Sequence, residues 1–251
     1  MNQSKDIDES NRQREVFADI IQFRRSNRAF DSNIEVPDDV IHKALEHAIL
    51  SPNSSNMQLW EFHWIATKDM LDAFIPLCLD QQAAKTAKHL VVFVTRQDLW
   101  KQRAEWNVQQ IESAIQGEAN TFQKAGLNYY KKLMPIMYMR DPFGLMGIFR
   151  KALSFFMGLK GPFFRAGGAA QQRITVHKSC ALAAQTFMLS IASAGFHTCP
   201  MEGFDEKRVK KILNLPRRAE INMIIAVGKG TEKGIWGPRF RVPHEEVVVT
   251  H

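Results

Sequence analysis

The chain has 251 residues, of which 45% are hydrophobic and 24% are charged, and its formal net charge is +7. It is long enough to bury a full core, which excludes a chain that is disordered over most of its length. The three cysteines, Cys78, Cys180 and Cys199, form neither a Cys-x-x-Cys pair nor a metal-ligand spacing. They argue against a disulfide framework or a metal site, and they predict reduced thiols in a cytoplasmic protein.

The N-terminal region predicts a helix that leads into a cluster of cations. Residues 1–13 are polar and highly charged, without the apolar stretch of a signal peptide, and we expect them to form a loose tail. Apolar residues at three- and four-residue spacings predict an amphipathic helix over residues 14–25. Its end carries Arg24, Arg25, Ser26 and Arg28. Such a cluster is either a solvated basic face at a helix end or an anion site, in which guanidinium groups and a hydroxyl bind a phosphate.

A polar segment, residues 51–60, follows a second predicted helix over residues 38–49. It holds one proline, three serines, two asparagines and one glutamine, and it ends on Trp60. The segment is a poor core element, but its hydroxyls and amides offer donors and acceptors to a planar polar ligand. The alternative is a helix C-terminus that simply runs into a turn.

The rest of the chain predicts a mixture of strands and helices. Runs of β-branched and apolar residues predict strands over residues 62–66, 89–94, 196–199 and 221–228, and a last strand over residues 247–250. Helical periodicity predicts helices from about residue 68 and over residues 98–124, 179–194 and 205–213.

Residues 131–165 differ in composition from the rest of the chain. They carry seven lysines and arginines against one aspartate, together with six phenylalanines, so most of the net charge lies here. Residues 145–159 predict a helix that is apolar over most of its surface but too short and too charged to span a membrane. Three roles fit this segment: a cap over a bound ligand, a helix on an anionic membrane, or a surface for single-stranded nucleic acid. Single-stranded nucleic acid would not use the apolar stripe of this helix. We therefore favour the cap and keep membrane contact as the alternative.

Four motifs occur in a fixed order along the chain. They are Arg24-Arg25-Ser26-x-Arg28, Ser51-Pro52-x-Ser54-x-Asn56-x-Gln58-x-Trp60, Pro200-x-Glu202-Gly203-Phe204-Asp205 and Arg239-x-Arg241. Together they resemble the FMN-dependent nitroreductase family, and within it the oxygen-insensitive NAD(P)H nitroreductase and dihydropteridine reductase branch. The resemblance covers about residues 14–96 and 170–251, and it fails over most of residues 100–168.

The resemblance implies an α+β fold with a mostly antiparallel central sheet flanked by helices. Residues 14–251 would form one FMN-binding domain, with residues 100–168 as a divergent helical cap. It also implies a homodimer with FMN at the interface, and a C-terminal strand that can cross to the partner.

The same resemblance implies a set of FMN-binding residues. Positions matching the family's phosphate site are Arg24, Ser26, Arg239 and Arg241, and Arg28 matches a basic residue at the flavin ring. The turn at Glu202 and Gly203 resembles one whose backbone faces flavin N5. A wall beside the ring and ribityl chain is implied for Pro52, Asn53, Ser54 and Asn56, and Arg25, Pro200 and Met201 complete the set. One departure concerns Asp80-Gln81-Gln82-Ala83, where many relatives carry an asparagine and a lysine; Gln81 or Gln82 could replace the asparagine, but the lysine has no counterpart.

The implied activity is electron transfer from NADH or NADPH through FMN to a small acceptor such as a nitroaromatic or a quinone. The reductant would leave before the acceptor binds, in a ping-pong cycle, and no side chain would act as a catalytic nucleophile. Two alternatives stay open: a flavin-dependent reductase or dehalogenase of one dedicated substrate, and a flavoprotein that contacts a membrane surface through residues 131–165.

Overall fold

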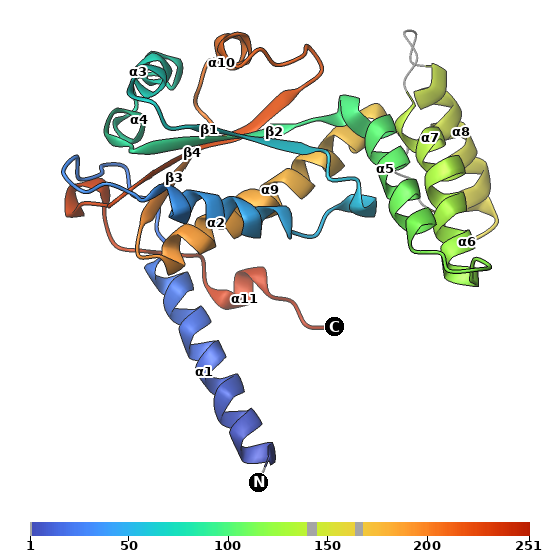
Figure 1. The fold of residues 1–251 in the computed structure, drawn as a ribbon, viewed down its shortest axis with the longest axis horizontal. Helices are drawn as coiled ribbons and strands as arrows, with labels where there is room; N and C mark the ends of the chain where they lie inside the picture. Colours follow the sequence, from blue (N-terminus) through green and yellow to red (C-terminus); the bar gives the residue numbers. More distant parts are fainter. Residues whose placement is uncertain (1, 140–144, 164–167) are drawn as a thin grey trace.

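A four-stranded antiparallel sheet lies at the centre of this computed structural model, which describes residues 2–139, 145–163 and 168–251 (Figure 1). The strands are β1 (Trp60–Ile65), β2 (His89–Thr95), β3 (His197–Met201) and β4 (Glu220–Gly228). Their order in the sheet is β1-β2-β4-β3, and all three pairings are antiparallel. The four internal strands predicted from the sequence are therefore confirmed, with β1 and β3 at the edges.

Helices cover both faces of the sheet because its central strands are apolar on both sides. One face is covered by α3 (Lys68–Leu77), α4 (Gln82–Thr86) and α10 (Glu206–Ile212). The other face is covered by α2 (Asp38–Ile49) and α9 (Ala169–Ser193). Along β2, Leu90, Val92 and Val94 pack on the first side, whereas Val91 and Phe93 pack on the second. This alternation follows from the two-residue period of a strand, and it confirms the predicted α+β class.

Helix α1 (Asn2–Phe23) projects away from the sheet and begins earlier than the sequence predicted (Figure 1). The expected loose tail over residues 1–13 is wrong for residues 2–13, which are helical, and Met1 lies outside the described residues. Lysine, glutamate, arginine and two glutamines in this stretch are good helix formers, and they help to extend α1 toward the N-terminus. The side chains of Val16, Phe17 and Ile21 are exposed along it.

The described parts of residues 100–163, which include several helices, lie at one end of the sheet (Figure 1). They consist of α5 (Trp100–Ser113), α6 (Thr121–Asn128), the π-helical turn η3 (Tyr129–Leu133), α7 (Met134–Tyr138) and α8 (Leu145–Leu159). Residues 140–144 and 164–167 of the predicted cap lie outside the described residues. Within the described ranges, no helix combines the length and the apolar character needed to cross a membrane.

The single helix predicted over residues 98–124 is wrong. A short helix, η2 (Gln97–Leu99), precedes α5, and α5 ends at Ser113. Gly117 then takes a φ of 84°, and Asn120 starts α6 with a capping box. A positive φ suits glycine and interrupts a helix, which the amphipathic pattern alone did not reveal.

The C-terminal segment does not form its predicted strand in this chain. After β4 come η4 (Glu232–Gly234) and α11 (His244–Val247), and residues 248–251 adopt no regular structure. A strand needs a neighbour to bond its backbone groups. The described part of the chain places no strand beside residues 247–250, so their exchange between two copies stays a prediction.

Candidate functional site

Arginines from both ends of the chain meet around one cavity of about 410 Å³. Its lining residues are Arg24, Arg25, Ser26, Arg28, Trp236, Gly237, Pro238, Arg239, Phe240 and Arg241. The sequence left two interpretations of the first cluster, a solvated basic face or an anion site. Bringing Arg239 and Arg241 next to Arg24 favours the anion site, because isolated surface cations would not be gathered from positions so far apart in the chain.

Hydrogen bonds to backbone carbonyls hold the two segments together. The Arg239 guanidinium donates to the carbonyl oxygens of Gln22 at 2.9 Å and Arg24 at 2.7 Å, so it satisfies groups that the end of α1 leaves unpaired. The Arg25 Nη2 donates to the carbonyl oxygen of Gly237 at 2.7 Å. Arg241 has a different role, because its Nη1 donates to the carbonyl oxygen of its own neighbour, Phe240, at 2.7 Å.

The cavity carries several positive charges, which favour the binding of an anion. Burial, followed by the positive charges of Arg239 and Arg241, lowers the pKa of Arg24. Among the described residues that line the cavity, none is acidic. A phosphate dianion at this position would offset the repulsion and accept charge-assisted hydrogen bonds from several guanidinium groups.

Asn27 stands at the unspecified position of the first motif, between Ser26 and Arg28, and it fixes the loop that carries these arginines. It is 1% exposed, its Nδ2 donates to the Thr231 carbonyl at 2.8 Å, and its Oδ1 accepts from the Ala29 N–H at 3.1 Å. The next residue, Arg28, donates its backbone N–H to the Gly234 carbonyl at 2.9 Å. These bonds set the direction of the Arg28 side chain, whose Cζ lies 4.3 Å from the centre of the Trp236 ring.

Edge strand β3 connects the arginine cavity to the predicted turn at residues 200–203. Ser26 forms a parallel bridge with Thr198, and the Asn27 N–H donates to the Thr198 carbonyl at 3.0 Å. The strand then runs to Met201 and delivers Glu202 and Gly203 to an exposed turn. Pro200, Met201, Glu202 and Gly203 therefore continue along the same sheet edge as the cavity, and Met201 is buried in the core.

Gln81 contacts this turn. It belongs to residues 80–83, the segment whose sequence differs from the family pattern. Its Nε2 donates to the Gly203 carbonyl at 2.6 Å and to the Cys78 carbonyl at 3.0 Å. Leu79 and Asp80 just before it both have a φ of 55°, an uncommon conformation for residues other than glycine. A strained loop that places an amide beside the predicted ring site is typical of a binding site.

The polar segment at residues 51–60 lies at the other end of the molecule, beside α5 (Figure 1). Its centre forms the short helix η1 (Ser54–Asn56), in which Ser55 and Asn56 have φ values of 57° and 48°. Asn53 Oδ1 accepts from the Gln58 N–H at 2.8 Å, and the amides of Asn56 and Asn107 bond to one another at 3.1 Å. Pro52, Ser54 and Asn56 are exposed and Asn53 is partly exposed. One chain alone therefore does not bring this wall to the arginine cavity.

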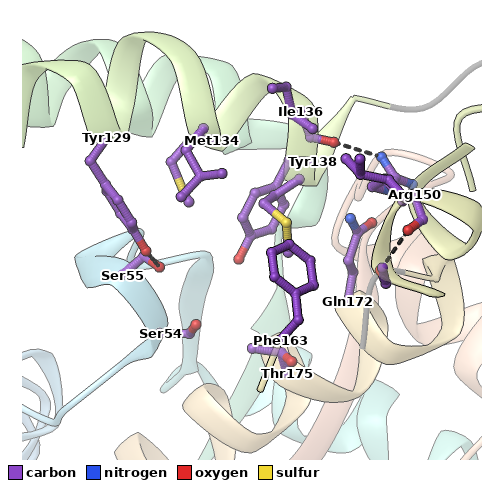
Figure 2. A pocket seen from close by; sticks show the side chains of 14 residues that line it. Ser54, Ser55, Tyr129, Met134, Ile136, Tyr138, Arg150, Phe163, Gln172 and Thr175 are labelled. Carbon is purple, nitrogen blue, oxygen red and sulfur yellow. Dashed lines mark hydrogen bonds between the residues drawn. The ribbon is translucent and has the colours of Figure 1, made fainter. Parts of the chain in front are cut away.

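A second cavity, of about 460 Å³, lies between η1, α9 and the cap helices. Figure 2 shows Tyr138, Phe163 and Gln172 among the side chains that line it. Burial, with Tyr129 nearby, raises the pKa of Tyr138 to about 12, so this phenol stays neutral. Gln172 is 4% exposed, and its Nε2 has no hydrogen-bond partner among the residues that the structure describes. The cavity is thus mainly apolar with one unpaired donor, which suits a ligand that carries an acceptor oxygen.

Sequence reasoning missed Asn27, Trp236 and Gln172. A tryptophan directly before Gly237 and Pro238 and three residues ahead of Arg239 was the available signal for Trp236. Asn27 and Gln172 gave no such signal, because their roles depend on loops and helices distant in the chain.

The sequence profile described as "Nitroreductase family" matches residues 21–229. The chain belongs to the nitroreductase family. It is therefore an oxidoreductase, and the predicted family and enzyme class are confirmed.

Relatives and solved structures agree with this family. The chain is 27% identical over 215 residues to Protein DrgA of Synechocystis sp., which covers 85% of this chain and 84% of that protein. It is 36% identical over 86 residues to the putative NAD(P)H nitroreductase MhqN of Bacillus subtilis, covering 34% and 42% of the two chains. The putative nitroreductase ydfN of Bacillus subtilis has the same fold, with a TM-score of 0.71, 22% identity and coverage of 94% and 98%. A putative nitroreductase from Exiguobacterium sibiricum, solved in complex with FMN, has a TM-score of 0.63 at 19% identity, with coverage of 94% and 97%.

Proposed function

We propose that this family member binds FMN and transfers electrons from NADH or NADPH to a small acceptor such as a nitroaromatic or a quinone. The observation that carries the proposal is the arginine-lined cavity beside edge strand β3. Relatives named as putative NAD(P)H nitroreductases, and the neighbour solved with FMN, support the choice of cofactor and reductant. Reductant and acceptor use the same site in turn, as a ping-pong cycle requires.

The residues of the cavity suit FMN because each end of the cofactor finds a chemically matched group. Arg24, Ser26, Arg239 and Arg241 would hold the terminal phosphate through charge-assisted bonds. When bound, FMN supplies a ring that accepts hydride and passes electrons on. Arg28 is the cation that we assign to stabilising the negative charge which hydride acceptance places on that ring. The turn that carries Gly203, braced by the Gln81 amide, would orient the ring from the sheet edge.

A homodimer would complete this site. The wall formed by Pro52, Asn53, Ser54 and Asn56 lies far from the arginines of its own chain (Figure 1). A second copy, related by two-fold symmetry, would bring its wall to the arginine cavity of the first, and the reverse. Such an interface would also cover the exposed apolar side chains of α1 and of the C-terminal segment. We place the enzyme in the cytoplasm, where NADH and NADPH are supplied and thiols such as its three buried cysteines stay reduced.

The direct test is the absorption spectrum of the purified protein. We expect a yellow protein whose released cofactor is FMN and not FAD, because clustered arginines fit a terminal phosphate and leave no site for an adenosine. It should oxidise NADH or NADPH when a nitroaromatic acceptor is added. A colourless protein that fails to quench the fluorescence of added FMN would contradict the proposal.

Replacing Arg28 tests the assignment of the ring cation. We expect Arg28→Ala to retain FMN but to be reduced by NAD(P)H at least about tenfold more slowly, because one charge-assisted interaction is lost. Stopped-flow absorbance at the flavin band measures this rate. Arg28→Lys is the matched control and should recover most of it, since the charge is kept. Equal reduction rates in Arg28→Ala and the unmodified protein would show that the assignment is wrong.

A further inference from the structure

A surface helix usually turns its apolar face toward the core, but helix α8 turns its apolar face outward. Its polar residues Arg150 and Ser154, which are 4% and 6% exposed, face the protein. The Arg150 Nη1 donates to the carbonyl oxygens of Ile136 and Met139 at the end of α7, at 2.9 and 2.8 Å. The polar face of α8 is thus occupied in holding the cap together.

The apolar face of α8 points outward. Its exposed large side chains recur at three- and four-residue spacing, as one helix stripe: Leu145, Ile148, Phe149, Phe155, Phe156 and Leu159. Each of them is more than half exposed. A contiguous apolar stripe of this kind is unfavourable in water and marks a surface that contacts something else.

The charged residues within the α8 stretch itself are all positive. Between residues 145 and 163 the chain contains Arg150, Lys151 and Lys160 and no aspartate or glutamate. Arg150 faces inward, whereas Lys151 and Lys160 are exposed. An apolar stripe with exposed lysines complements an anionic lipid surface, in which the rings enter the acyl boundary and the ammonium groups meet the headgroups.

The second cavity borders α8 as well, since Leu153 and the buried Arg150 and Ser154 are among its lining residues. Leu153 and Phe163 line that cavity, and both are still about two-fifths exposed. Leu133 and Ile136 of the neighbouring helical segment share both properties. Partly exposed apolar side chains therefore lie at the edge of the cavity next to α8.

We propose that the outward face of α8 lies on an anionic lipid surface, parallel to the membrane and without crossing it. A second copy of the chain is the competing occupant, but its own α8 would present only further cations, whereas an anionic lipid surface offers headgroups to Lys151 and Lys160. The inward polar face allows the helix to remain part of the cap while its outer face contacts lipid. This proposal depends on the cap surface and is independent of the flavin chemistry.

Co-sedimentation with vesicles tests the proposal on the intact protein. We expect binding to vesicles that contain phosphatidylglycerol, weaker binding to phosphatidylcholine alone, and partial release by high salt. Phe149→Gln/Phe156→Gln should reduce the partition coefficient by more than about tenfold, because two rings no longer enter the bilayer. Lys151→Gln/Lys160→Gln should reduce it by about fivefold for each lysine.

Matched controls use the same changes on other helices. Leu50→Gln removes an exposed apolar side chain at the end of α2, and Lys207→Gln removes an exposed charge from α10; both should bind vesicles like the unmodified protein. The α8 variants should keep their FMN content and melting temperature, because the replaced side chains point away from the core. The proposal is overturned if the unmodified protein stays in the supernatant with both lipids, or if the α8 variants bind unchanged. A drop in molar mass by light scattering in the Phe149→Gln/Phe156→Gln variant, without vesicle binding by the parent, would assign the face to a second copy instead.

Discussion

Arg241→Ala is expected to lower the affinity of the protein for FMN by roughly 10- to 150-fold. The loss corresponds to one charge-assisted hydrogen bond, about 1.5–3 kcal/mol. Arg241 is the best arginine to replace because its guanidinium bonds to the adjacent Phe240 carbonyl and does not tie distant segments together, so we expect its removal to leave the fold intact. Arg239→Ala is less informative, because Arg239 also binds the carbonyls at the end of α1.

Fluorescence quenching of FMN on titration with the unloaded protein measures this loss. The matched control is Arg217→Ala, which removes an exposed arginine outside the cavity and should leave the dissociation constant unchanged. The difference between Arg241→Ala and the parent should shrink at high salt, since part of the attraction is screened. A dissociation constant that is the same for Arg241→Ala and Arg217→Ala would remove Arg241 from the phosphate site.

Gly234→Ala is expected to destabilise the fold by about 1–3 kcal/mol and to weaken FMN binding at the same time. A Cβ at this buried position would lie 1.8 Å from Asn27 Oδ1 and 2.6 Å from the Ala29 nitrogen. Asn27 cannot move away without losing its bonds to Thr231 and Ala29. Because the Arg28 N–H bonds to the Gly234 carbonyl, the arginines beside Asn27 would be displaced as well.

Urea unfolding followed by circular dichroism gives the change in stability. Gly147→Ala is the matched control, since it makes the same chemical change within helix α8, where a Cβ would meet no atom within 4 Å. It should raise stability, or leave it unchanged, because alanine favours a helix over glycine by about 1 kcal/mol. Equal unfolding midpoints for Gly234→Ala and the parent protein would show that the loop around Asn27 adapts to the added methyl group.

The core strands could be predicted from the sequence because their signal is local. In β2, a run of β-branched and apolar residues specifies a strand buried on both faces, whatever elements cover it. Helix α8 was predicted with its observed bounds for the same reason. The interrupted helix at Gly117 and the helical residues 2–13 were missed, because a single positive φ and an exposed helix end leave little trace in the apolar pattern.

For the candidate site too, some features could be predicted from the sequence and others required the tertiary structure. The sequence by itself determined which residues could bind a phosphate, since guanidinium groups and hydroxyls near Arg24 and Arg241 have that chemistry in any fold. Only the tertiary structure decided between an anion site and a solvated basic face, because that depends on the approach of segments more than two hundred residues apart.

Helix α8 of the cap shows most clearly what cannot be predicted from the sequence. The sequence determined that residues 145–159 form a helix with a narrow polar face. Only the tertiary structure decided that Arg150 and Ser154 turn inward while Lys151 stays exposed, because Arg150 must reach the carbonyls at Ile136 and Met139. The apolar stripe is left outside as a consequence, since the direction of a helix face depends on its neighbours and not on its own periodicity.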